Sequence, residues 1–170
     1  MDKKNNRVAF HEAGHAIACI MLNVRFKEVS IIPEEEKSLG HILLSNFKLH
    51  SDYDDSDKTR LKAEKFIMIS LSGAIAERKF TKKTNNIGAY DDYKKCMDIA
   101  GNLFNSINVM ICFMNFMLAQ TNSLFTCEDE KNADTEAWLK VKLLAKELIN
   151  SKILKYRDVI SLLENKFTYV

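Results

Sequence analysis

The stretch Val8-Ala9-Phe10-His11-Glu12-Ala13-Gly14-His15-Ala16 decides how the fold of this 170-residue chain is predicted. From Asn5 to about Asn23, apolar residues recur with the spacing of an α-helix and not with the alternation of a strand. Positions four apart on a helix lie one turn apart on the same face. His11 and His15 are therefore expected to reach a single ion, with Glu12 beside the open coordination position.

This His-Glu-x-x-His spacing predicts a metal site that hydrolyses amide bonds. Zinc prefers nitrogen and carboxylate ligands, and a catalytic site keeps its fourth position for a water. Binding to zinc lowers the pKa of that water to about 7. Glu12 is the predicted base, which takes the proton and carries it to the departing amine. The alternative interpretation is a pair of surface histidines that bind nothing.

The motif needs a third ligand, and the short metzincin spacing does not supply one, because positions 18 and 21 are alanine and methionine. A carboxylate at the beginning of a helix that packs across the first helix would be held by rigid backbone. Asp91 and Asp92 occupy such a place, although aspartates that merely cap a helix at the surface are the alternative. Spacing alone leaves six candidates open: His41, His50, Glu77, Asp91, Asp92 and Asp98.

The rest of the chain predicts a mainly α-helical (α+β) domain with a small β-sheet or hairpin. Two predicted strands flank a short acidic connection at 34–37, and the first strand ends at Pro33, the only proline in the sequence. A polar loop at 51–57 leads into a helix in which Gly73 is expected to permit close helix packing. A second loop covers 120–133. The predicted elements are strands at 26–33 and 39–44 and helices at 58–80, 89–118, 134–149 and 154–165.

Length and composition predict one domain over residues 1–170. An alternative division has a catalytic body at 1–120 and a C-terminal helical pair at 121–170. The chain is 46% hydrophobic and 28% charged, so it can bury a core. Its net charge of +2, without a long basic run, does not suggest a nucleic acid or an acidic membrane as partner.

The cysteines and the apolar segments bear on location. Cys19, Cys96, Cys112 and Cys127 form no Cys-x-x-Cys pair and are predicted to be buried free thiols in a reducing compartment. No secretion signal is recognised at the N-terminus, so a cytoplasmic location is expected. The most apolar window, 107–119, is shorter than the roughly 20 residues that cross a bilayer. It is predicted to be a core helix.

Several segments together closely resemble the peptidase domain of the FtsH-type ATP-dependent zinc metalloproteases. The segment from Val8 to Ala16 is the most specific, and Val29-Ser30-Ile31-Ile32-Pro33 and Leu39-Gly40 follow it in the same order and spacing. Residues 72–77 are similar to that family's Gly-Gly-Arg-x-Ala-Glu helix, and residues 88–92 to its Gly-Ala-x-x-Asp segment. The resemblance covers nearly the whole chain. It implies a zincin-like fold, and it implies Asp92 as the third zinc ligand.

The same resemblance implies how substrate binds. In this family an edge strand beside the metal pairs with extended substrate through main-chain hydrogen bonds, which here implies Leu39, Gly40, His41 and Ile42. The alternative is a strand buried in a small hairpin. His41 could also supply a proton or steady the oxyanion, and a partly exposed side chain is the simpler interpretation. Ser72 and Ile75 differ from the residues that are usual in the family's helix. These differences are expected to affect substrate preference and to leave zinc binding intact.

The predicted function is therefore a zinc-dependent endopeptidase acting on unfolded or extended polypeptide. No Gly-x-x-x-x-Gly-Lys-Ser/Thr phosphate loop occurs in the 170 residues, so a separate ATP-dependent unfoldase is an expected partner. A homo-oligomer is expected by analogy with the ring-forming family, and Glu77 or Asp91 is expected to orient the imidazoles. The alternatives are a catalytically silent zincin-fold module that binds a protein partner and a metal-sequestering or metal-sensing protein.

Overall fold

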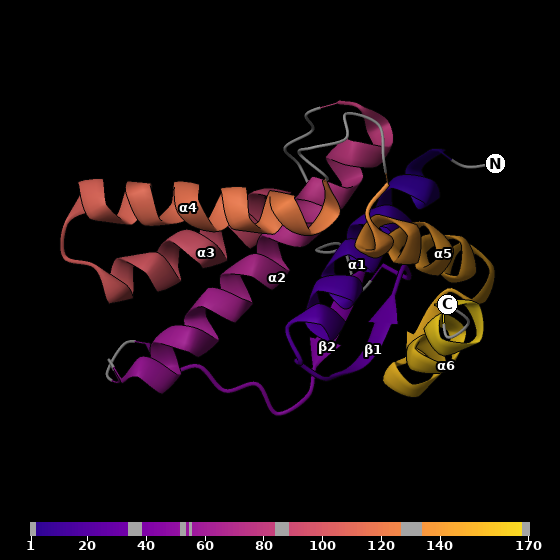
Figure 1. The fold of residues 1–170 in the computed structure, drawn as a ribbon, viewed down its shortest axis with the longest axis horizontal. Coiled ribbons are helices and arrows are strands. Elements are labelled where there is room, and N and C mark those ends of the chain that lie inside the picture. Colours follow the sequence, from indigo (N-terminus) through magenta and orange to yellow (C-terminus); the bar gives the residue numbers. More distant parts are fainter. Residues whose placement is uncertain are drawn as a thin grey trace.

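The computed structural model describes residues 3–33, 39–51, 54, 56–83, 89–126 and 134–167. Within these ranges the predicted mainly helical fold with a small sheet is confirmed (Figure 1). The helices are α1 (Lys3–Met21), α2 (Asp57–Thr81), α3 (Ala89–Leu103), α4 (Ile107–Phe125), α5 (Glu136–Ser151) and α6 (Tyr156–Phe167). The strands are β1 (Phe26–Ser30), β2 (His41–Leu44) and β3 (Ile153–Lys155).

Helix α1 runs through the core, and α2 and α5 pack against it (Figure 1). Its small residues allow a close crossing, since a β-carbon at Gly14 would stand 2.6 Å from the carbonyl oxygen of Ser72 and 2.7 Å from Cβ of Ala76. The expectation that Gly73 permits close packing is also confirmed, because its neighbours are side chains of α1. The crossing therefore brings α2 against the histidine face of α1.

The sheet has three antiparallel strands in the order β2-β1-β3, with Val29 opposite both Ile42 and Leu154. The prediction that the last helix begins at Leu154 is wrong, because Lys152 has a left-handed φ of 66° that ends α5. The main-chain N–H of Ile31 then donates to the carbonyl of Lys152 at 2.9 Å, which leads β3 alongside β1. β2 consequently lies at one edge of the sheet.

The prediction of one long helix over 89–118 is wrong. α3 ends at Leu103, and α4 begins at Ile107 after a turn at 104–106 and continues to Phe125, past the predicted start of a loop at 120. The turn folds α4 back along α3, and both helices pack on α2 (Figure 1). The prediction that 107–119 is a core helix holds for one face only, since Ile107 is 67% exposed and Phe116 59% exposed.

The cysteines divide into two kinds. Cys19 and Cys96 are buried and free, and burial raises the pKa of each thiol to about 12, so neither is a reactive thiolate. Cys112 is free but exposed on α4, which corrects the prediction of a buried thiol. Cys127 lies outside the described residues, as do the connection at 34–37, part of the 51–57 loop and Gly88.

Two organisational points complete the fold. No helix among the described residues is both long and apolar enough to cross a membrane. α6 packs against β1 and β3, and α5 packs against α1. The alternative boundary at residue 120 would fall inside α4. The organisation as one domain over residues 1–170 stays a prediction.

Candidate metal centre

Helices α1 and α3 bring two imidazoles and one carboxylate together. Nε2 of His11 lies 3.2 Å from Oδ2 of Asp92, and Nε2 of His15 lies 3.3 Å from the same oxygen. One ligand atom from each of these residues lies within 4.8 Å of the other two. Both histidines are buried, and only 18% of the Asp92 side chain is exposed. Two nitrogens and one carboxylate oxygen in this arrangement form a donor set of the kind that zinc takes.

The other candidate ligands do not join this cluster. Asp91, next to Asp92 on α3, is exposed, as are Asp98 and His50. Glu77 lies nearby but contacts the far side of a histidine ring. His41 lies on β2, where Nε2 is 3.7 Å from Oε1 of Glu28. Among the described residues, the geometry therefore favours Asp92 over the five alternatives.

Each imidazole has its second nitrogen engaged away from the cluster. Nδ1 of His15 lies 2.6 Å from the carbonyl oxygen of Ile69, and Nδ1 of His11 lies 3.3 Å from Oε2 of Glu77. A carbonyl and a carboxylate accept hydrogen bonds, so both rings are held with Nδ1–H donating and Nε2 free to face a metal. Of the two expected orienting residues, Glu77 makes this contact, whereas Asp91 is exposed.

Arg7 extends this contact by one further residue. Its Nε and Nη2 atoms donate to Oε1 of Glu77 at 2.9 Å and 2.6 Å. Arg7, His11 and His15 follow one another at intervals of four, so they lie on the same face of α1. Sequence analysis missed Arg7 although that spacing was visible. It also missed the carbonyl of Ile69. A sequence carries no signal for such a contact, because every residue has a main-chain carbonyl.

Gly73 of α2 lies under the two rings. A β-carbon there would stand 2.7 Å from Nε2 of His11 and closer still to His15. Any other residue would fill the space that the two nitrogens occupy. The absence of a side chain at position 73 is thus what allows α2 to support the pair of imidazoles from beneath.

The charges of the site are strongly coupled. Burial lowers the pKa of His11, but hydrogen bonds to Asp92 and Glu77 outweigh it and raise that pKa to about 10. Burial raises the pKa of Asp92, and the neighbouring imidazoles outweigh it and hold the carboxyl well below its ordinary range. Contacts with His11 and Arg7 likewise lower the pKa of Glu77 against the effect of its burial. Without a metal, the cluster therefore holds a proton between His11 and Asp92, which a cation would have to displace.

Glu12 lies beside the cluster and is 5% exposed. Burial raises its pKa, with His15 and His11 acting in the opposite direction. The chain just before β2 comes very close to it, since a β-carbon at Gly40 would stand 2.9 Å from Oε1 of Glu12 and 2.7 Å from the carbonyl oxygen of Ser30. Of the four residues expected to bind substrate, Gly40 thus adjoins Glu12, His41 and Ile42 lie on β2, and Leu39 is exposed beside it.

Comparison with known proteins gives one family and two relatives. The family model for peptidase family M41 matches residues 1–126. The chain is 28% identical to the mitochondrial inner membrane m-AAA protease component YTA10 of Saccharomyces cerevisiae, over 96% of this chain and 24% of that protein. It is 36% identical to the ATP-dependent zinc metalloprotease FtsH 2 of a Thermoanaerobacter species, over 59% of this chain and 18% of that protein. The matched part is at most about a quarter of each relative's length.

Proposed function

We propose, on the premise that this chain belongs to peptidase family M41, that it is a zinc-dependent endopeptidase with Glu12 as its general base. The proposed zinc ligands are His11, His15 and Asp92. The observation that carries the proposal is the convergence of these three side chains next to a buried carboxylate. The chemistry of the site supports the proposal in addition to the family match, because the donor set and the glycine beneath it fit a tetrahedral cation.

The roles of the residues follow from their positions. When bound, zinc supplies Lewis acidity, which makes water acidic and polarises the scissile carbonyl. Glu12 takes a proton from water and delivers it to the departing amine. The raised pKa of Glu12 suits its role as the acceptor of the proton from water, because burial favours the neutral carboxyl. Glu77 and the Ile69 carbonyl hold the imidazole rings in one orientation while this occurs.

The proposed substrate is extended polypeptide, bound beside β2. An edge strand offers main-chain groups that a peptide can pair with, which gives affinity with loose sequence preference. The close approach of Gly40 to Glu12 means that a peptide bound along residues 39–42 runs next to the proposed base. Unfolded segments, or proteins delivered by a separate ATP-dependent unfoldase in the cytoplasm, are the proposed substrates.

The decisive experiment compares Glu12→Gln with the wild-type chain, using casein and a fluorogenic peptide as substrates. We expect the wild type to cleave both, and we expect the variant to lose cleavage while its zinc content, measured by elemental analysis, is unchanged. Glu64→Gln is the matched control, since it removes a carboxylate from the exposed ion pair with Arg60 on α2. Zinc binding without cleavage by the wild type would instead favour the non-hydrolytic interaction module.

A further inference from the structure

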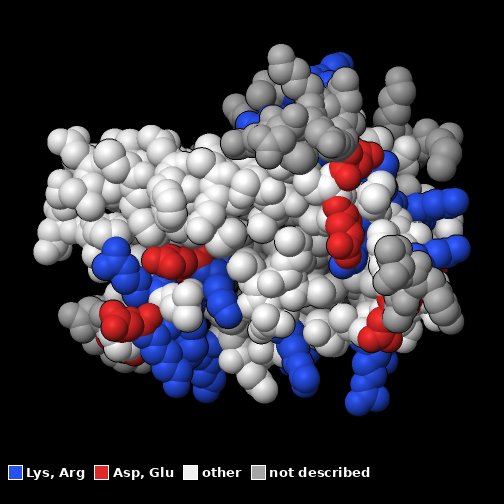
Figure 2. Space-filling model, viewed as in Figure 1, with Lys and Arg blue, Asp and Glu red and all other residues white. Residues whose placement is uncertain are grey.

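The first turns of α2 carry lysines on one side of the helix. Lys58, Lys62 and Lys65 follow one another at intervals of four and three, so they lie on the same face. Lys48, on the connection that follows β2, lies close to them, since Nζ of Lys62 donates to the carbonyl oxygen of Lys48 at 3.5 Å. Figure 2 shows basic side chains gathered over the start of α2, at the lower left of the view. We name these four residues the lysine stripe.

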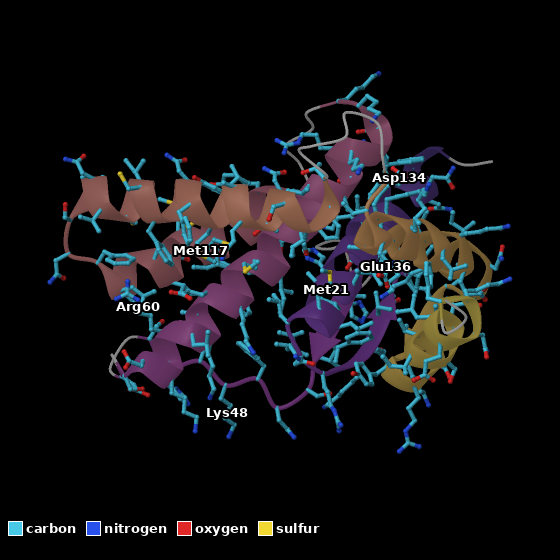
Figure 3. The ribbon with its side chains drawn as sticks, in the orientation of Figure 1. Met21, Lys48, Arg60, Met117, Asp134 and Glu136 are labelled. Atoms are coloured by element: carbon cyan, nitrogen blue, oxygen red, sulfur yellow. The ribbon has the colours of Figure 1, made fainter. Side chains whose placement is uncertain are left out.

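The lysine stripe has no acidic partner in the described part of the chain, where none of its residues forms an ion pair. Asp57 and Glu64 belong to the same turns of α2 but lie on a different face. Glu64 instead pairs with Arg60 at 3.8 Å. Arg60 lies over the ring of Phe104, on the side of α2 toward α3, whereas Lys48 lies below α2 (Figure 3). Positive charges at this spacing repel one another, so the stripe favours a bound group that carries negative charge.

The stripe begins one helical turn from the metal centre. Lys65 precedes Ile69 by four residues, a rise of about 6 Å, and the carbonyl oxygen of Ile69 is the acceptor for Nδ1 of His15. From Lys65 the stripe leads away from the histidines toward the start of α2. A molecule held at the metal centre can therefore contact the stripe with a part that lies outside the centre.

The stripe is also reached along β2. Pairing at this edge continues past the last residue of β2, since the main-chain N–H of Ser45 donates to the carbonyl of Arg25 at 2.9 Å. The chain then passes beneath the first half of α2 (Figure 1), where the ring centroids of Phe47 and Phe66 lie 5.8 Å apart. A peptide that pairs with β2 and continues in the direction of this strand therefore runs toward Lys48.

We propose that the lysine stripe binds an acidic segment of the polypeptide substrate, away from the scissile bond. The inference rests on the proposed function, since it extends the peptide path beside residues 39–42. Gly40 adjoins the proposed base and so marks the position of the scissile bond. Lys48 lies beyond the end of the strand that follows Gly40, so acidic side chains about four or more residues from the scissile bond reach the stripe. The stripe supplies affinity and takes no part in hydrolysis.

The surroundings of the stripe favour polypeptide over other polyanions. Leu61, which is 54% exposed, stands among the lysines and offers an apolar contact that a phosphate backbone would not use. A net charge of +2 over 170 residues is far from the strongly basic balance typical of nucleic-acid-binding domains. A helix that lies on a membrane buries a broad apolar face, whereas this face of α2 carries one leucine between lysines. An acidic peptide segment that contains an apolar residue matches both the charge and the leucine.

The test measures the binding of fluorescent peptides to the zinc-loaded Glu12→Gln chain, which is expected to leave them uncut. Three peptides share an apolar middle segment and carry four aspartates after it, four aspartates before it, or serines in both places. Because the stripe lies on one side of the metal centre, one acidic peptide should bind about tenfold more tightly than the serine peptide, and the other should not. About 1 M salt, where the Debye length is about 3 Å, should remove the difference.

Two lysines of the stripe are then changed together in the same chain. Lys58→Gln with Lys62→Gln should remove most of the advantage of the acidic peptide. Lys142→Gln with Lys146→Gln, which removes the same charge at the same spacing from α5, is the matched control and should retain that advantage. Circular dichroism establishes that both double variants are folded.

Equal affinity for the three peptides would overturn the proposal, as would the same loss of affinity in both double variants. A single-stranded oligonucleotide or phosphatidylserine vesicles that bind through Lys58 and Lys62 more tightly than the acidic peptide would overturn the choice of polypeptide. A wild type that cleaves casein while the three peptides bind alike contradicts only the role of the stripe. Binding of the acidic peptide through the stripe, by a chain that cleaves nothing, contradicts only the proposed function.

Discussion

Gly73 of α2 lies so close to His15 of α1 that a β-carbon at position 73 would overlap Nε2 of the imidazole. Side chains do not approach a β-carbon this closely, so any other residue at position 73 would force the imidazole to move. The helix that supports the histidines thus lacks a side chain at the point where their coordinating nitrogens lie. Helix packing and metal geometry depend on the same contact.

We predict that Gly73→Ala weakens zinc binding while most of the helical structure remains. The new methyl group must push His15 and His11 out of line with Asp92, which should weaken zinc affinity by at least about tenfold. The measurement is competition with a chelating indicator. Gly101→Ala is the control, since a β-carbon there meets nothing within 4 Å. It should raise the free energy of unfolding by about 0.5–1 kcal/mol, because alanine favours helix more than glycine does.

We predict that Asp92→Asn lowers zinc affinity and Asp91→Asn does not. Both changes remove one negative charge from the first turn of α3, but only Asp92 reaches the histidine pair. Loss of a ligand should cost more than the about 10–100-fold that loss of a ligand's hydrogen-bond partner costs. Zinc content after dialysis checks this for both variants. Equal retention of zinc by the two would contradict the assignment of Asp92.

The sequence was sufficient for those parts of the site that lie on one helix. His11, Glu12 and His15 are brought together by the pitch of α1 alone, so their spacing predicted their proximity. Asp92 lies 77 residues beyond His15, and only the resemblance to a family indicated it among six candidates. The comparison with peptidase family M41 confirms that resemblance. Contacts that depend on how α2 crosses α1, such as the one between the Ile69 carbonyl and His15, could not be predicted from the sequence.

The missed elements have equally specific causes. No glycine or proline interrupts residues 89–118 except Gly101, so the pattern did not reveal the turn at 104–106. Asn105-Ser106 before the apolar run was the available signal, since such residues begin helices. β3 has only three residues, too few for alternation to register, and it depends on pairing with β1. Its presence is a tertiary effect and not a property of the segment.

We predict that the metal-free protein loses stability as pH rises through the titration of His11. The pKa of this imidazole is about 10 in the folded protein, against an ordinary value of 6.5. Folding therefore favours its protonated form, and this contribution is fully present below pH 6.5 and is lost as pH rises to about 10. Urea unfolding with a chelator present measures the effect. His11→Gln should remove that part of the slope, and identical slopes for the two proteins would contradict the prediction.

We predict that Glu77→Gln weakens zinc affinity by about 10–100-fold without removing a ligand. Glu77 accepts hydrogen bonds from Arg7 and, on its other oxygen, from Nδ1 of His11, so it fixes the ring that presents Nε2 to the metal. Arg7→Gln should act in the same direction and less strongly, because it leaves Glu77 in place but unanchored, and Arg7→Lys should restore part of the loss.

Arg78→Gln removes an arginine that instead contacts Asn122, and it should leave zinc affinity unchanged. The spectrum of the cobalt-substituted protein separates the two explanations of any loss, since a tilted imidazole changes the metal's coordination whereas general destabilisation does not. Unaltered affinity and spectrum in Glu77→Gln would show that the packing of α1 against α2 is enough to hold His11.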